Sequence, residues 1–356
     1  MRSLGDPPAA ARAGKPPGPA SERIKFRRER AESRRRSTRG QYRGSYSGSY
    51  NRAMAVRSVC VLGGSGFVGT HLCGDLARDG WRITVPTRNP VRAQHLAPIP
   101  SLKLVAADIH DPRSLGALVA GQTAVVNLVG ILNERGRGGS GFTRVHVDFV
   151  RMMVEACRRG RVERLVHVSS LNADAEQGPS HYLRSKGRGE RIVRDECGAD
   201  LAWTILRPSV IFGPRDEFVN RFARLLRTIP FALPLARPGA RFAPVWVGDV
   251  VAAIQRALND DRVALETYEL CGPERLTLRE IVCRVRDRLG LMRAVIGIPD
   301  FAARLQAAVC DFVPGKPFST DNYRSLLVDS VCKVNGLARL GIRPQPLDAV
   351  LPGYLI

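Results

Sequence analysis

The strongest constraint on this chain is an apolar run that leads directly into a glycine-rich turn. Residues 59–62 read Val-Cys-Val-Leu, and Gly-Gly-Ser-Gly-Phe-Val-Gly follows at 63–69. Glycines at this spacing permit a tight turn and let the backbone approach a pyrophosphate, which then lies at the N-terminus of the following helix. Because strand, turn and helix occur together, the pattern favours a dinucleotide-binding unit over a purely structural turn. The residues expected to contact the cofactor here are Gly63, Ser65, Gly66, Phe67, Val68 and Gly69.

Apolar runs and amphipathic segments alternate from this turn to about residue 207. The expected strands are 58–62, 82–87, 102–106, 124–130, 165–169 and 203–207, and the expected helices are 66–79, 112–120, 142–159 and 183–196. Nearly continuous apolar strands are typical of a sheet that is covered on both faces. The alternation therefore predicts an α/β fold, a Rossmann-type doubly wound parallel sheet, over residues 54–207.

The pattern changes after residue 207, where shorter elements are mixed. We expect helices at 217–227, 248–258, 277–289 and 299–312 and a strand at 267–271. These pieces predict a smaller C-terminal α/β lobe, residues 208–356, that covers the carboxyl edge of the sheet. The helix at 299–312 carries an apolar stripe of Phe301, Leu305, Ala308, Val309 and Phe312. Packing on the core is the commoner cause of such a stripe, and contact with a membrane surface or a partner is the alternative.

The basic charge of the chain is concentrated near its start. The net charge is +22, and residues 1–53 hold 14 Lys/Arg and 4 Asp/Glu, so 14 − 4 = +10 of it lies there. This Arg-, Gly-, Ser- and Pro-rich segment cannot bury enough apolar surface to fold, and we expect it to be disordered. An organelle-targeting arm and a nucleic-acid-binding tail are two interpretations. We favour a third, that translation begins at Met54, which leaves nucleic acid an improbable partner.

Cysteine spacing and hydropathy give two further expectations. The eight cysteines form no CxxC pair and no cluster with histidine, which favours reduced thiols over a disulfide framework and predicts no metal site. No apolar run reaches the roughly 18–20 residues of a transmembrane helix. We therefore expect a cytoplasmic protein, with peripheral association at the inner membrane as the alternative.

The choice of cofactor depends on the end of the second strand. An NAD site places a carboxylate there for the ribose 2′-hydroxyl, whereas this chain has Thr87-Arg88-Asn89. Since an arginine can pair with a 2′-phosphate, Arg88 favours NADP(H) over NAD(H), although a solvated surface arginine would look the same. The ends of the third and fourth strands supply the residues expected near the adenine and near the nicotinamide ribose, which are Asp108, Ile109, Asn127, Leu128 and Val129.

Tyr182 and Lys186 are the candidate catalytic pair. Their spacing of four residues places the phenol and the ammonium on one face of a helix. The lysine, together with a cationic nicotinamide, would lower the pKa of the tyrosine from about 10 and so suit it to proton transfer. Ser169 or Ser170, at the end of the preceding strand, would hydrogen-bond the substrate oxygen.

Several longer motifs carry a family resemblance. Arg-Pro-Ser-Val-Ile-Phe-Gly-Pro at 207–214 and Val-Trp-Val-Gly-Asp-Val at 245–250 resemble the extended, epimerase/dehydratase-like branch of the short-chain dehydrogenases/reductases. The segments 167–175, 182–186 and 216–222 are similar to an atypical subgroup, which includes the NADPH-binding accessory subunit of respiratory complex I and its bacterial relatives. The resemblance covers the chain from Met54 onward. It implies NADPH bound through the glycine turn and Arg88, with Lys186 and Pro208 also at the cofactor.

The resemblance leaves the function open between two classes. The Ser/Tyr/Lys set predicts an NADP(H)-dependent oxidoreductase or epimerase-like enzyme that acts on a small or quinone-related substrate. In the complex I subunit, however, the nucleotide is regarded as structural, which implies a non-catalytic structural or assembly factor of a respiratory or ubiquinone-biosynthesis complex at the membrane surface. A nucleic-acid-binding protein is the weakest hypothesis, because only the basic segment at residues 1–53 supports it.

Overall fold

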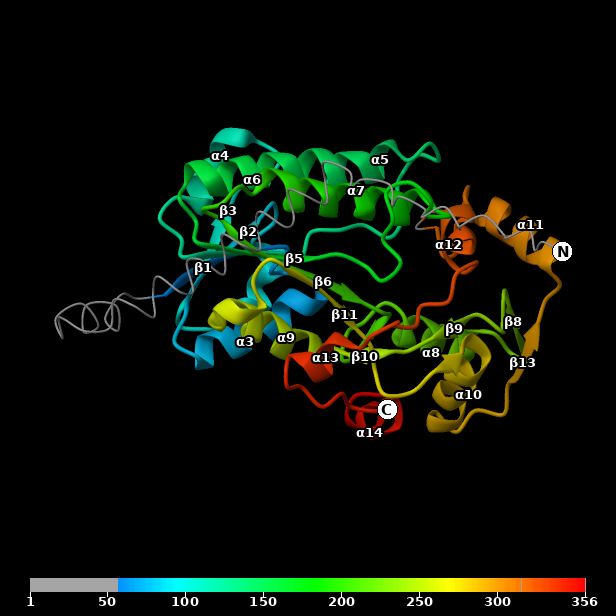
Figure 1. Cartoon of the computed structure of the whole chain (residues 1–356). Coiled ribbons are helices and arrows are strands. Elements are labelled where there is room, and N and C mark those ends of the chain that lie inside the picture. Colours follow the sequence, from blue (N-terminus) through cyan, green and yellow to red (C-terminus); the bar gives the residue numbers. More distant parts are fainter. Residues whose placement is uncertain (1–56, 315, 356) are drawn as a thin grey trace, which may run out of the picture. The chain divides into compact units, whose positions relative to one another are not determined.

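The computed structural model describes residues 57–314 and 316–355, which are built around a seven-stranded parallel sheet (Figure 1). The strand order is β11-β6-β5-β4-β1-β2-β3, and every neighbouring pair is parallel. The strands are β1 Ser58–Leu62, β2 Arg82–Thr87, β3 Leu102–Ala106, β4 Ala124–Asn127, β5 Arg164–Val168, β6 Ala202–Pro208 and β11 Glu266–Leu270. This order, with crossovers to both sides of β1, confirms the predicted Rossmann-type fold. The segment 1–53 lies outside the described residues.

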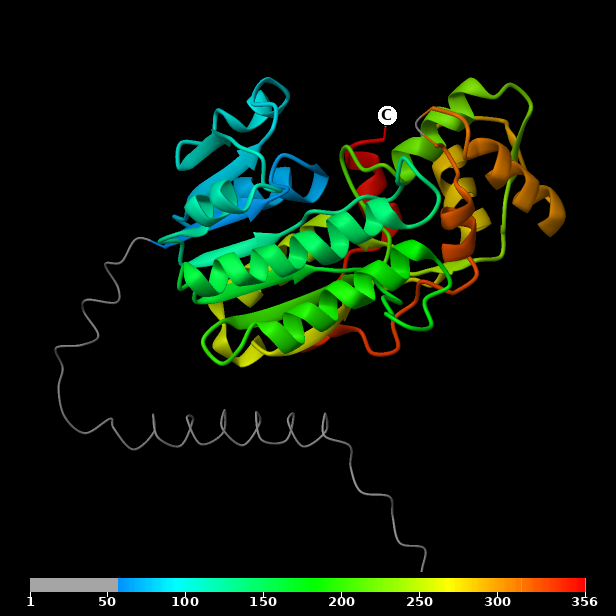
Figure 2. The same cartoon turned by 90° about the horizontal axis from the view of Figure 1, so that it is seen from above.

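Helices cover both faces of the sheet (Figures 1 and 2). One face is covered by α4 Pro112–Val119, α6 Phe149–Arg159 and α7 His181–Glu196, and the other by α3 Phe67–Arg78 and α9 Val247–Asn259. In β1, Val59 and Val61 pack into the core on one face while Cys60 and Leu62 pack into the core on the other. All four are fully buried. This two-sided burial is why the strand reads as a continuous apolar run.

The C-terminal lobe has its own apolar core at the carboxyl edge of the sheet. Its elements are α8 Val219–Thr228, β8 Ala232–Leu235, α10 Leu278–Arg288, β13 Ala294–Gly297, α11 Asp300–Cys310, α12 Thr320–Ser325 and α14 Leu347–Val350. Parallel pairing joins β8 to β13, and short pairs join β7 Ile211–Phe212 to β10 Val245–Trp246 and β9 Arg241–Phe242 to β12 Leu276–Thr277. Thr277 and Glu280 form the capping box at the start of α10.

The predicted helix at 142–159 is one continuous helical segment that changes its winding. It begins as α5 Ser140–Thr143, widens into the π-helical turn η2 Arg144–Asp148, and continues as α6. A π-turn inserts an extra residue into the helix and often marks a functional site. Here it places His146, which is buried, beside the candidate catalytic helix α7.

Two expectations are wrong. The structure joins Cys271, just after β11, to Cys332 in a disulfide, although we expected only thiols. The two residues lie 61 positions apart, so their spacing carries no signal of the pairing. The apolar stripe of α11 faces solvent instead of packing on the core, because the small side chains of Ala303 and Ala307 form the buried side of that helix.

The described part of the chain has no helix with the length and apolar content that a bilayer crossing requires. Within residues 57–314 and 316–355, no group of three or more His, Cys, Asp or Glu side chains is placed to hold a metal ion.

Candidate functional site

The glycine turn forms a backbone cradle at the start of α3. Gly63 has a φ of +82°, a left-handed conformation that favours glycine. A Cβ on Gly69 would lie 2.5 Å from the Cα of Gly64, so the helix can approach the turn only with glycine there. Gly66 is the N-cap of α3 and supplies no side-chain cap, which leaves N–H groups of the first helical turn available to an anion. The cradle therefore fits a dinucleotide pyrophosphate.

Helix α7 holds the candidate catalytic pair in fixed positions. The Ser180 hydroxyl accepts a hydrogen bond from the backbone N–H of Leu183 and caps the helix. The carboxylate of Asp321, from α12, accepts the backbone N–H groups of His181 and Tyr182 at 2.7 and 3.0 Å. An acidic group is favourable at a helix N-terminus. The C-terminal lobe thus anchors the turn of α7 that carries Tyr182.

Tyr182 and Ser170 are brought together as predicted. The Ser170 side chain favours the ionised tyrosine, but burial outweighs this effect and raises the pKa of the phenol. The protein's own groups therefore do not lower this pKa as we expected from Lys186. Ser169 lies beside Ser170, and its buried hydroxyl has no hydrogen-bond partner within the described protein.

Lys186 is buried one helical turn from Tyr182, at 6% exposure. Its Nζ donates to the carbonyl oxygen of Val168 at 3.1 Å. Burial lowers the pKa of the ammonium from 10.5 to about 8, and the nearby Glu190 carboxylate opposes that effect. A Cβ on Gly130 would lie 3.3 Å from Nζ, so the small residue after β4 leaves room for the lysine.

Sequence reasoning missed His146, which packs against Tyr182. The two ring centroids are 5.6 Å apart and the rings meet edge to face. Nε2 of His146 accepts the backbone N–H of Ile131 at 3.2 Å, which leaves the proton on Nδ1, 2.8 Å from the Ser185 hydroxyl. Burial and Lys186 hold the pKa of this histidine well below 6.5, so the ring is neutral. No spacing in the sequence signals it, because the π-turn that aims it is a tertiary feature.

The residues at the end of β4 have two different roles. Asn127 is fully buried, where it contacts Nδ1 of His167 at 3.0 Å and accepts the backbone N–H of Val129 at 3.0 Å. It therefore orders the strand end beneath the site, while Leu128 faces the cavity. Because the Asn127 amide donates to Nδ1, the proton of His167 lies on Nε2, which is buried and has no partner in the described protein.

The residues predicted for the adenosine side gather near His110. Arg88, exposed at the end of β2, and Asp108 both act electrostatically on the pKa of that histidine. The Asp108 carboxylate accepts the backbone N–H of His110 at 3.0 Å, and Ile109 packs on the core. None of Arg88, Asp108 or Ile109 lines the large cavity described next.

A cavity of about 950 Å³ lies between the glycine turn and the C-terminal lobe. The sheet side of the cavity contains the candidate site residues Gly63, Ser65, Gly66, Phe67, Val68, Gly69, Leu128, Ser169, Ser170, Tyr182, Lys186 and Pro208. The lobe side is mainly aromatic and aliphatic, and includes Phe218, Phe222, Leu225, Leu233, Leu235, Phe242, Phe318 and Leu326. A polar end, which holds Tyr182 and Lys186, therefore opens into an apolar compartment.

Comparison with known proteins identifies the class. Residues 63–217 match the family model described as NAD(P)H-binding. The chain belongs to the NAD(P)-binding, epimerase/dehydratase-like branch of the short-chain dehydrogenases/reductases, in the subgroup that includes an accessory subunit of respiratory complex I.

Two relatives and one solved structure show how similar this chain is to known proteins. The chain is 32% identical, over 83% of its length and 75% of the relative's, to the mitochondrial NADH dehydrogenase [ubiquinone] 1 alpha subcomplex subunit 9 of Arabidopsis thaliana. It is 30% identical, over 71% of its length and 77% of the relative's, to the ceramide reductase of Caulobacter vibrioides. The UDP-glucose 4-epimerase of Thermus thermophilus, solved with NAD, shares the fold with a TM-score of 0.64, 22% identity and coverage of 81% and 94% of the two chains.

Proposed function

We propose that this protein is an NADP(H)-dependent oxidoreductase that acts on an apolar carbonyl compound, small or quinone-related. The observation that carries the proposal is that Ser170, Tyr182 and Lys186 line one cavity together with the glycine turn and an apolar compartment. The relative named as a ceramide reductase supports a reductive role. We further propose that the protein is cytoplasmic or peripheral at the inner membrane.

The residues of this chain divide the chemistry among them. The bound nicotinamide supplies or accepts the hydride. Ser170 holds the substrate oxygen, and Tyr182 donates a proton to it as the carbonyl becomes an alcohol. Lys186, protonated below about pH 8, would offer N–H groups to the cofactor ribose. Ser169 has an unused buried hydroxyl for a polar group of the ligand.

The test of catalysis compares two tyrosine variants. Replacement of Tyr182→Phe removes one hydroxyl and should lower the rate of NADPH-dependent carbonyl reduction by about 10²–10⁴-fold, the usual contribution of a general acid. The matched control is Tyr268→Phe, which removes the hydroxyl of another buried tyrosine, on β11 and outside the cavity. Equal rates for the wild type and Tyr182→Phe, with NADPH still bound, would remove the enzymatic proposal.

Preference for NADPH over NADH is proposed from Arg88. Its exposed guanidinium follows β2 with no carboxylate beside it in Thr87-Arg88-Asn89, so it is free to pair with a 2′-phosphate. Replacement of Arg88→Ala should weaken NADPH binding at least about tenfold, the equivalent of one charge-assisted hydrogen bond, and leave NADH binding unchanged. Calorimetry with both nucleotides measures this, and equal losses for both would contradict it.

A second candidate is a non-catalytic subunit or assembly factor of a respiratory or ubiquinone-biosynthesis complex. The relative from Arabidopsis thaliana, a subunit of NADH dehydrogenase, favours it. Isolation of the protein in a stable respiratory complex, combined with normal respiration in a Tyr182→Phe strain, would support this candidate over the enzyme. Isolation without a partner would exclude it.

A further inference from the structure

Helix α11 presents its large apolar side chains to solvent. Phe301, Leu305, Val309 and Phe312 are 74%, 65%, 58% and 72% exposed, and we refer to these four as the α11 ridge. Their spacing of three to four residues places them on one side of the helix. Ala303 and Ala307, on the other side, are fully buried. A surface helix ordinarily has the reverse pattern, with its large apolar residues inside.

Other apolar side chains are exposed at the same end of the lobe. Phe231, at the start of β8, is 85% exposed, and Met292 and Ile296, before and within β13, are 100% and 53% exposed. Strands β8 and β13 pair with each other, and β13 leads directly into α11 (Figures 1 and 2). The lobe therefore exposes further large apolar side chains outside α11.

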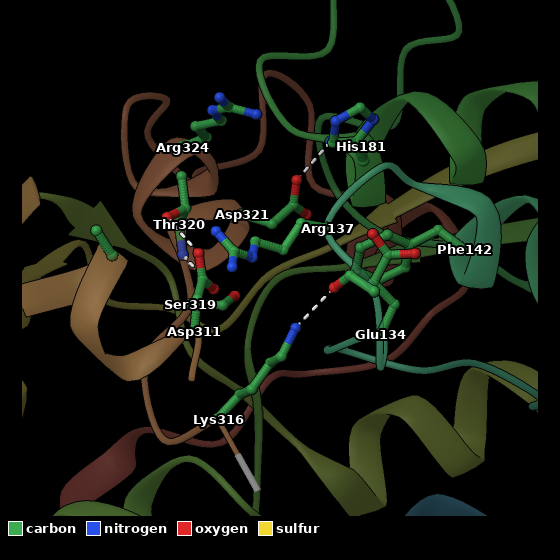
Figure 3. A pocket seen from close by; sticks show the side chains of 12 residues that line it. Glu134, Arg137, Phe142, His181, Asp311, Lys316, Ser319, Thr320, Asp321 and Arg324 are labelled. Carbon is green, nitrogen blue, oxygen red and sulfur yellow. Dashed lines mark hydrogen bonds between the residues drawn. The ribbon is translucent and has the colours of Figure 1, made fainter. Parts of the chain in front are cut away.

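A pocket of about 220 Å³, lined by both cations and carboxylates, adjoins the C-terminal end of the ridge (Figure 3). Arg137 and Arg324, both exposed, and Lys316 line it. The guanidinium of Arg137 lies 4.1 Å from the ring centroid of Phe312, so cation and ridge are in direct contact.

The carboxylates of the same pocket already have partners within the protein. Glu134 is buried and accepts the backbone N–H groups of Gly139 and Gly141. Asp321 caps α7, and Asp311 accepts from the backbone and hydroxyl of Thr320. The acids thus have hydrogen-bond partners within the protein, while Arg137 and Arg324 are exposed and offer positive charge to a ligand.

The ridge is also continuous with the large cavity. Gln306, on α11, and Pro317 and Phe318, in the segment after α11, line that cavity. One side of this region therefore borders the apolar compartment while the other carries the exposed ridge. A surface bound there would lie beside the compartment.

We propose that the α11 ridge inserts into the interfacial layer of an anionic lipid bilayer, with Arg137 and Arg324 against the lipid phosphates. Large apolar side chains flanked by cations are the chemistry of a helix that lies in a membrane interface. Without the +10 of residues 1–53, the net charge is still +22 − 10 = +12, which favours anionic over neutral lipid. The ridge is independent of nucleotide binding and of catalysis, so the proposal stands or falls separately from the enzymatic one.

Vesicle flotation of the full chain tests the proposal. We expect binding to vesicles of phosphatidylcholine with 30% phosphatidylglycerol, weaker binding to pure phosphatidylcholine, and a loss with added salt as charge is screened. Replacement of Val309→Glu together with Leu305→Glu should reduce binding at least tenfold. The matched control is Val91→Glu, which alters an exposed valine (70%) outside the lobe. The double replacement Arg137→Ala with Arg324→Ala should remove the preference for anionic vesicles.

The alternatives give different results. Wild-type protein that ignores both kinds of vesicle, or ridge variants that bind like Val91→Glu, would overturn the proposal. So would a stable dimer or a complex with another protein that the ridge variants disrupt, because the ridge would then be a protein interface. All the replaced side chains are exposed, and unchanged melting temperatures would confirm that the variants fold.

Discussion

Replacement of Lys186→Met should stabilise the nucleotide-free protein. Lys186 is buried, and the shift of its pKa from 10.5 to about 8 measures the cost of keeping the ammonium charged in the folded state. At about 1.4 kcal/mol for each pH unit, the cost at pH 7 is about 3 kcal/mol. Methionine has a similar length and no charge. The Lys186→Met variant loses the hydrogen bond from Nζ to the Val168 carbonyl, worth about 1 kcal/mol. The net gain in the free energy of unfolding is therefore about 2 kcal/mol.

The stability difference between the wild type and Lys186→Met changes with pH in a direction that the pKa of Lys186 determines. Because the folded pKa of Lys186 lies below the unfolded one, the folded state releases its proton first as the pH rises through about 8. Wild-type stability therefore increases relative to Lys186→Met between about pH 8 and 10.5, and the advantage of the variant is greatest below pH 8.

Thermal and urea unfolding at pH 7 and at pH 9.5 measure both effects. A gain of about 2 kcal/mol corresponds to roughly 3 °C in melting temperature for a domain of this size. Lys333→Met, at an exposed lysine, is the control and should change little. A Lys186→Met variant that is less stable than wild type at pH 7, or whose advantage grows above pH 8, would refute the reasoning.

Three further predictions concern the packing around the site. Glu190 is fully buried and bound by Arg207, so Glu190→Ala should cost about 3 kcal/mol in urea unfolding by leaving the arginine unpaired. Burial raises the pKa of Asp249 from 3.8 to about 6, so native stability falls as the pH rises from 4 to 6; Asp249→Asn should remove that slope and melt higher at pH 7. Gly69→Ala should abolish nucleotide binding by calorimetry, since its Cβ would overlap Gly64.

The sequence predicted the parts of the fold that local patterns determine. The bounds of β1, β2 and β3 agree with the expected ranges, because buried or partly buried aliphatic residues recur along each of these short strands. Tyr182, Lys186 and Ser170 also meet as expected, since the spacing of the first two fixes one helix face and the sheet order places the third beside it.

The unpredicted features depend on contacts between distant segments. Asp321 reaches Tyr182 across 139 residues, and Cys271 reaches Cys332 across 61. The apolar stripe of α11 is another example. The sequence predicts that these residues share one side of a helix, but periodicity does not show which side the helix buries. Ala303 and Ala307 determine that side, because their small size permits close packing against Ala236 and Tyr323.

The distribution of unsatisfied polar groups bears on the choice between an enzyme and a structural subunit. Ser169 and His167 have buried polar atoms without partners in the described protein, and Lys186 remains charged at a cost in stability. A permanently bound nucleotide would compensate such costs under either interpretation, so these groups do not separate the two. The apolar compartment beyond Tyr182 is different, because a nucleotide held at the glycine turn does not require it. A tyrosine and a serine hydroxyl that line the same cavity as that compartment are the groups that a substrate carbonyl requires, and this favours the enzyme.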